Sequence, residues 1–121
     1  MARPSIIEPK PLPLADDELV AKLFRALGDS TRLRIVEMLL EGPMYQKEIV
    51  DAVDLSQGQV SQHLACLTWC GLVCAEREGR LVRYLVDNPR IVALVDLARG
   101  FLNATDADIA ACRIIDNQDI G

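Results

Sequence analysis

The chain has 121 residues, of which 50% are hydrophobic and 26% charged, which is enough for one compact domain with one core but not for two. No stretch approaches the roughly 20 apolar residues that span a bilayer, and the first residues do not resemble a signal peptide, so we expect a cytoplasmic protein with no membrane partner. The net charge of −5 argues against a uniformly basic surface, although residues 56–83 alone carry more positive than negative groups.

The first elements expected along the chain are an arm and two helices. Four prolines oppose helix formation in residues 1–15, which we expect to form a flexible arm. Apolar residues then recur at helical spacing behind an acidic start, which predicts a helix from residue 16 to about residue 27. A second helix is expected at 31–40, with Asp29 or Ser30 as its cap.

The second half of the chain changes its periodicity twice. A short helix is expected at 46–53, followed by a tight turn and a longer helix within 56–70. Alternating apolar and charged residues around a glycine-containing tip predict a β-hairpin within 72–86. Pro89 starts a last helix, expected to reach about residue 102, which is apolar most of the way round. In so small a chain, that helix predicts an interface with a second copy, shared with the first helix. The fold class expected is mainly α with a small β-hairpin, a winged helix-turn-helix in a homodimer.

The short helix, the turn and the longer helix form the pattern of a DNA-binding helix-turn-helix. On a helical wheel, Val60, Leu64 and Leu67 form the core face, and polar side chains point away from it. Glutamine can pair with adenine, serine can reach a phosphate or a base, and hairpin arginines can reach phosphates or the minor groove. The candidate DNA-binding residues are Ser56, Gln57, Gln59, Ser61, Gln62, Arg77, Arg80 and Arg83. Such a face could also be merely solvated, but the arginine-bearing hairpin favours DNA binding.

Four cysteines in a reducing compartment do not suggest a disulfide framework, so each is a core thiol, a reactive thiol or a metal ligand. Cys66 and Cys70 lie one turn apart on the longer helix, off its core face. Two thiolates can clasp a soft ion that requires three or four ligands, and Cys112, in a polar acidic segment, is the natural third. Cys74 is expected in the core, with a role as an extra ligand left open, and His63 is the other candidate for an extra ligand.

Several segments together resemble the ArsR/SmtB family of metal-sensing repressors. They are LGDSTRLRI at 27–35, LSQGQVSQHL at 55–64, GLV at 71–73 and EGR at 78–80. The match extends over about residues 17–103, with the motifs in the family's order. The resemblance implies a homodimeric winged-helix repressor that binds an imperfect inverted repeat in double-stranded operator DNA and releases it when metal binds.

The segment 64–73 resembles the cadmium/lead-sensing branch of that family. In that branch, two cysteines at this spacing join one from the C-terminal tail of the other protomer, and Cys66, Cys70 and Cys112 match this arrangement. Residues 41–48 lack the Cys-x-Cys of sensors that bind metal on the preceding helix, and the last helix lacks the histidines of an interfacial zinc or nickel site. The implied effector is a thiophilic ion, Cd(II) or Pb(II), with Hg(II), As(III) and Zn(II) as further candidates.

The chain is thus expected to comprise the arm, a DNA-binding and dimerisation domain at 16–103, and a tail at 104–121 that carries a candidate ligand. Neither an enzyme nor a small organic substrate is expected, because no orienting residue supports a Cys–His nucleophile. Two alternatives stay open. The cysteines could respond to redox conditions without a metal, or the chain could be a dimeric interaction module whose reading helix is degenerate.

Overall fold

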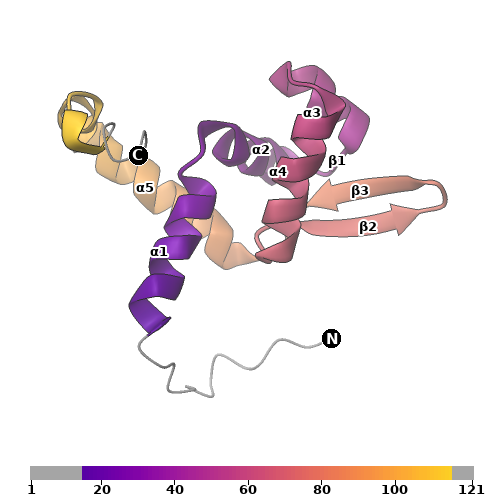
Figure 1. The fold of residues 1–121 in the computed structure, drawn as a ribbon, viewed down its shortest axis with the longest axis horizontal. Coiled ribbons are helices and arrows are strands. Elements are labelled where there is room, and N and C mark those ends of the chain that lie inside the picture. Colours follow the sequence, from indigo (N-terminus) through magenta and orange to yellow (C-terminus); the bar gives the residue numbers. More distant parts are fainter. Residues whose placement is uncertain (1–14, 116–121) are drawn as a thin grey trace.

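The computed structural model describes residues 15–115 (Figure 1). The predicted arm at 1–15 therefore lies outside the described residues, apart from Ala15, and so does the end of the tail, 116–121. The elements are α1 (Ala15–Leu27), α2 (Ser30–Glu41), β1 (Met44–Tyr45), α3 (Gln46–Val53), α4 (Gln57–Trp69), β2 (Cys74–Glu78), β3 (Leu81–Leu85) and α5 (Pro89–Ala110). This order agrees with the predicted succession of four helices, a hairpin and a last helix.

Side-chain caps fix where the helices begin. Asp29 accepts a hydrogen bond from the Arg32 N–H at 3.0 Å and starts α2, and Asn88 accepts one from the Arg90 N–H at 2.9 Å and starts α5. Between α3 and α4, Asp54 adopts the left-handed conformation with φ of 57°, which aspartate tolerates better than most residues. The turn of the helix-turn-helix is thereby defined.

The last helix is longer than the sequence predicted. It continues to Ala110, so the first residues of the expected tail at 104–121 are helical. The polar sequence predicts a tail from residue 104, but residues 103–110, NATDADIA, contain three alanines and neither glycine nor proline to end a helix.

The wing is a three-stranded antiparallel sheet in the order β1-β3-β2. The predicted hairpin is confirmed, with Glu76 opposite Arg83 and a tip at which Gly79 has φ of +63°. The sequence did not predict β1, because two residues are too few to show an alternating pattern. Figure 1 shows the hairpin projecting away from the helices, attached to them at the end where β1 lies.

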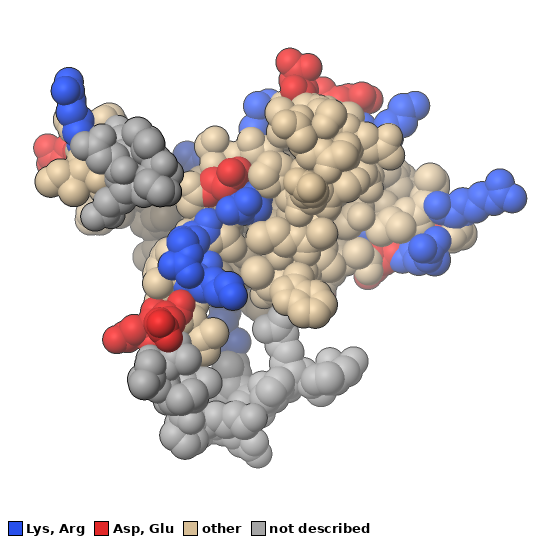
Figure 2. Space-filling view, in the orientation of Figure 1, with Lys and Arg blue, Asp and Glu red and all other residues tan. Residues whose placement is uncertain are grey.

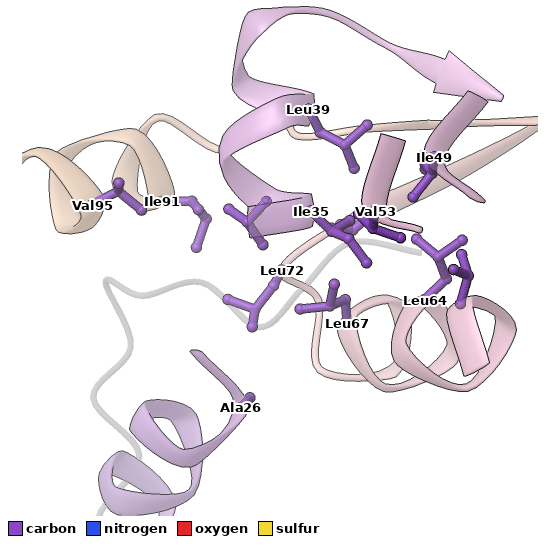
Figure 3. Packing of buried hydrophobic residues seen from close by; sticks show 13 residues of the cluster. Ala26, Ile35, Leu39, Ile49, Val53, Leu64, Leu67, Leu72, Ile91 and Val95 are labelled. Carbon is purple, nitrogen blue, oxygen red and sulfur yellow. The ribbon is translucent and has the colours of Figure 1, made fainter. Parts of the chain in front are cut away.

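The core holds the helix-turn-helix rigid. Side chains from α2, α3 and α4 meet in its centre (Figure 3), and Val60, Leu64 and Leu67, the predicted core face of α4, are at most 1% exposed. Each such side chain contributes about 1.5–3 kcal/mol when it is fully buried. The opposite face of α4 is thus held toward solvent.

Helices α1 and α5 leave apolar surface uncovered in one protomer. Leu19, Val20 and Phe24 of α1 are exposed, as are Leu97 and Phe101 of α5. A cavity of about 260 Å³ between α1, α2 and α5 continues this surface. Such a contiguous apolar surface marks an interaction site. No helix within residues 15–115 has the length and the apolar character of a membrane span.

Candidate DNA-reading surface and thiol site

Helices α3 and α4 are joined by a direct hydrogen bond on their exposed side. The side-chain amide of Gln46, at the start of α3, donates to the Ser61 hydroxyl at 2.6 Å. Ser61 was predicted to contact DNA, and the structure places it exposed on α4 but already bonded to the neighbouring helix. Its hydroxyl therefore links α4 to α3 as well as facing solvent.

The predicted DNA-reading residues of α4 share an exposed face but differ in their bonding. Ser56 and Gln59 form a capping box, in which the Ser56 Oγ accepts from the Gln59 N–H and the Gln59 Oε1 accepts from the Ser56 N–H, both at 3.1 Å. The Gln57 and Gln62 side chains are exposed and form no hydrogen bond with any other residue that the structure describes. Among the three glutamines predicted to read DNA, Gln57 and Gln62 thus have both the amide oxygen and the amide nitrogen available to bind DNA, whereas Gln59 uses its oxygen in the capping box.

The three arginines of the wing also differ. Arg83 pairs with Glu76 at 2.7 Å and with Glu78 at 3.4 Å. Arg77 donates to the Gly79 carbonyl at 3.4 Å, across the tip of the hairpin. Arg80 has no such partner among the described residues. The predicted DNA contacts Arg77 and Arg83 are thus already engaged within the wing.

Tyr45 attaches the wing to the helix-turn-helix. Its hydroxyl donates to the Glu78 carboxylate at 2.7 Å, and its backbone N–H donates to Glu48 at 2.8 Å. The hydrogen bond to Glu78, followed by the negative charge of Glu78, raises the pKa of the Tyr45 hydroxyl. Tyr45 therefore links strand β2 of the wing to helix α3 through these two hydrogen bonds.

The two thiols of α4 lie together at its C-terminal end. Cys66 is half-buried and Cys70, which ends the helix, is exposed. The pKa of the Cys70 thiol is raised, first by desolvation and then by the charge and the hydrogen bond of Cys66, while Lys22 and Arg32 act in the opposite direction. The two thiols therefore lie close enough for Cys66 to perturb the pKa of Cys70, one turn apart on the helix.

His63 lies one turn before Cys66 and faces a partly buried set of contacts around Arg32. The Arg32 Nη1 is 3.5 Å from the His63 Nδ1, and its Nε donates to the Ala26 carbonyl at 2.7 Å. Because arginine can only donate, the His63 Nδ1 is the acceptor in this contact. A cation beside Nδ1 opposes metal binding through that atom. The sequence did not predict this role for Arg32. Arg32 lies in the 27–35 segment, but nothing in that segment shows that its side chain contacts Ala26 and His63.

The other two cysteines are apart from this pair. Cys112 lies two residues beyond the last residue of α5, at the end of that helix that Figure 1 shows farthest from α4. Helix α5 is 22 residues long, or about 33 Å at 1.5 Å per residue. Cys74 is half-buried rather than in the core, and its thiol donates to Asp87 at 3.2 Å. Within residues 15–115 of one protomer, no three His, Cys, Asp or Glu side chains are grouped as metal ligands. One protomer therefore offers two adjacent thiols but not the third.

Comparison with known proteins identifies the family. Residues 29–74, which contain the helix-turn-helix, match the model of bacterial regulatory proteins of the arsR family. The "Probable mercury resistance operon repressor" of Streptomyces lividans is 40% identical over 101 residues, covering 84% of this chain and 81% of that protein. The chain belongs to the ArsR family.

Two further similarities extend over most of this ArsR-family chain. The HTH-type transcriptional regulator CmtR of Mycobacterium tuberculosis is 44% identical over 93 residues, covering 76% of this chain and 78% of CmtR. The homodimeric winged helix-turn-helix DNA-binding domain of Mb0332 from Mycobacterium bovis superimposes with a TM-score of 0.70 at 26% identity, covering 79% of this chain and 89% of that domain. The predicted winged helix-turn-helix fold and the family resemblance are both confirmed.

Proposed function

We propose that the protein is a cytoplasmic transcriptional repressor that binds operator DNA as a homodimer and releases it when a thiophilic metal ion binds its cysteines. The single observation that carries this proposal is the position of Cys66 and Cys70 on α4. The same rigid helix presents Gln57 and Gln62 at its exposed start and two adjacent thiols at its end. A ligand held by the thiols therefore acts directly on the element that reads DNA.

The donor set suits a soft metal ion. Cys66 and Cys70 would supply two sulfur ligands, and sulfur ligands favour soft ions over Mg(II) or Mn(II). The Cys112 of the same protomer lies beyond the far end of α5, so we assign the third ligand to Cys112 of the partner subunit. The name of the Streptomyces lividans relative, a mercury resistance repressor, supports an effector of this class. Cd(II) and Pb(II) are the ions we favour, and bound metal would supply a crosslink between the protomers.

The proposed dimer uses the uncovered apolar surface of α1 and α5. Phe24 on α1 and Leu97 on α5 are exposed in the isolated protomer, and a second copy would remove them from water. The Mb0332 domain, which has a similar fold, is homodimeric, and this supports a dimer. The shared metal site proposed here requires that this interface bring the tail of one protomer to α4 of the other.

The mechanism is a linkage between metal binding and DNA binding. The thiols at the end of α4, tied to the partner's tail, favour a dimer geometry in which the two reading helices no longer match successive half-sites of the operator. A coupling free energy of about 1–3 kcal/mol, typical of allosteric proteins, corresponds to a loss of operator affinity of roughly 5–150-fold.

A mobility-shift titration on the DNA upstream of the protein's own coding sequence tests this function. The reduced protein should bind this DNA, and stoichiometric Cd(II) or Pb(II), but not Mg(II), should weaken binding. The Cys66→Ser/Cys70→Ser double variant should bind DNA with the wild-type affinity and ignore both ions. If reduced protein binds the DNA but Cd(II) produces neither a thiolate-to-metal absorption band nor release, while peroxide does release it, the redox alternative replaces the metal sensor.

A further inference from the structure

A cleft lies between the helix-turn-helix and the wing. Its volume is about 480 Å³. One wall comes from β1, α3 and the first residue of α4, and the other comes from the tip of the hairpin. Its lining residues are Tyr45, Gln46, Lys47, Val50, Gln57, Arg80, Leu81 and Val82.

Two cations stand on opposite walls of this cleft. Lys47 lies on α3 and Arg80 at the tip of the hairpin, and both are exposed. Within residues 15–115, neither side chain forms an ion pair or a hydrogen bond. Figure 2 shows blue side chains gathered at the tip of the hairpin. Both walls of the cleft thus offer unneutralised positive charge, in a protein whose net charge is −5.

The acidic groups near the cleft are already occupied. Glu48 accepts from the Tyr45 N–H at 2.8 Å, and Glu78 accepts from the Tyr45 hydroxyl at 2.7 Å. Glu76 and Glu78 also share the guanidinium of Arg83. None of these carboxylates pairs directly with Lys47 or Arg80, so both cations are available to a ligand in the cleft.

We propose that this cleft seats one strand of the DNA backbone, with Lys47 and Arg80 contacting its phosphates from the two sides. The inference rests on the proposed DNA-binding function and names contacts for it. A helix in the major groove and a wing reaching the next groove have a phosphodiester strand between them, and the cleft lies between these two elements. Gln57, the first residue of α4, lines the cleft, so the cleft is continuous with the reading face.

This assignment separates the wing arginines by role. Arg80 contacts phosphate, whereas Arg83 holds the wing together through Glu76 and Glu78. Lys47 joins the DNA contacts, although it lies outside both the predicted reading helix and the hairpin. Contacts to phosphate carry no sequence information, so their loss weakens binding to any DNA alike.

The salt dependence of DNA binding tests the proposal. Full-length reduced protein, as Lys47→Gln and Arg80→Gln variants, is titrated with operator DNA and with a scrambled duplex over a series of salt concentrations. Removing one phosphate contact lowers the slope of log affinity against log salt by about one, and hence by about two in a dimer that carries both copies. The conservative Lys47→Arg variant should retain the wild-type slope.

Arg90→Gln is the matched control, since Arg90 is exposed at the start of α5 and does not line the cleft. Suppose that the wild-type protein binds operator DNA, but that Lys47→Gln, Arg80→Gln and the control all give the same slope. That result would contradict DNA-backbone binding in the cleft, while the proposed repressor function would still stand. A loss confined to the operator duplex would also contradict DNA-backbone binding in the cleft, because that result indicates base reading. If the wild-type protein binds no operator DNA at any salt concentration, the proposed function fails, and this inference fails with it.

Discussion

The Nη1 atom of Arg32 lies 3.5 Å from Nδ1 of His63, and this contact joins α2 to the DNA-reading helix one turn before Cys66. The same guanidinium donates to the carbonyls of Arg25 and Ala26 in the last turn of α1. One side chain thus connects the end of α1, the start of α2 and the middle of α4. His63 is part of this connection, which gives the ring a structural role without a metal.

His63 is not expected to be a metal ligand. Because its Nδ1 faces Arg32, His63→Ala should keep the thiolate-to-metal band and hold Cd(II) affinity within about threefold. The lost hydrogen bond should lower the free energy of unfolding by about 1 kcal/mol. Absorption titration and thermal unfolding measure the two effects separately. A fall in Cd(II) affinity as large as that of Cys66→Ser would instead make His63 a ligand.

Asp29 should make α2 sensitive to acid. Desolvation acts to raise the pKa of its carboxyl, but the Arg32 N–H hydrogen bond and the Arg32 charge outweigh it, so the pKa lies below its ordinary value of 3.8. The stability that this ionised cap contributes is complete above the ordinary pKa and is lost as pH falls through the folded-state pKa.

Replacing Asp29 separates the cap from its charge. Asp29→Ala removes the cap and should lower the free energy of unfolding by about 1 kcal/mol at pH 7. Asp29→Asn keeps a capping oxygen without the charge, so it should cost less. Denaturant unfolding from pH 7 to pH 3 should show the difference between wild type and Asp29→Asn shrinking below about pH 4. If the free energies of unfolding of wild type and Asp29→Asn differ by the same amount at every pH, the charge of Asp29 does not contribute to the stability of α2.

Replacing Gln59 and replacing Gln62 on the reading helix should have different effects on the stability of the protein. Gln59→Ala removes the hydrogen bond from the Ser56 N–H in the capping box, so it should lower the free energy of unfolding by about 0.5–1.5 kcal/mol in addition to any effect on DNA. Gln62→Ala breaks no such bond and should weaken operator binding while the melting temperature stays unchanged. Mobility shift and thermal unfolding on both variants check this. Unchanged DNA binding by Gln62→Ala would favour the interaction module over the repressor.

The dimer depends on the apolar face of α5. Leu97 is 73% exposed in one protomer, and Leu97→Glu should place a charge in the proposed interface and yield monomers. Leu81→Glu is the control, since Leu81 is exposed on the wing, away from α5. Sedimentation velocity at micromolar concentration distinguishes the two. Dimers of Leu97→Glu as stable as those of wild type would move the interface elsewhere.

Local patterns in the sequence were sufficient for most of the fold. Apolar periodicity predicted the buried face of α4 at Val60, Leu64 and Leu67, and the cap expected at Asp29 or Ser30 predicted the start of α2, where the structure shows Asp29 as the cap. These features depend on neighbours within a few residues, so the sequence alone displays them.

Contacts between distant segments were not predictable in the same way. The Tyr45–Glu78 bond joins residues 33 apart, and the Arg32–His63 contact joins residues 31 apart. The cleft with Lys47 arises only when the wing folds beside α3. Cys66 and Cys70 were found from their spacing, but the distance of Cys112 from them within one protomer depends on the course of α5, which the sequence did not define to its end.

A mixed dimer tests the central claim most directly. One protomer carries Cys112→Ser and the other carries Cys66→Ser/Cys70→Ser, and each variant alone lacks a site with all three thiols. If Cys66 and Cys70 bind metal together with Cys112 of the partner subunit, the mixed dimer regains one complete site. Cd(II) titration should then show one site per dimer with wild-type affinity, whereas Cys112→Ser dimers, which keep only the two thiols of α4, should bind Cd(II) more weakly and with a smaller thiolate-to-metal band, and Cys66→Ser/Cys70→Ser dimers should show no such band. A mixed dimer that binds Cd(II) no better than its two parents would contradict a metal site shared between protomers.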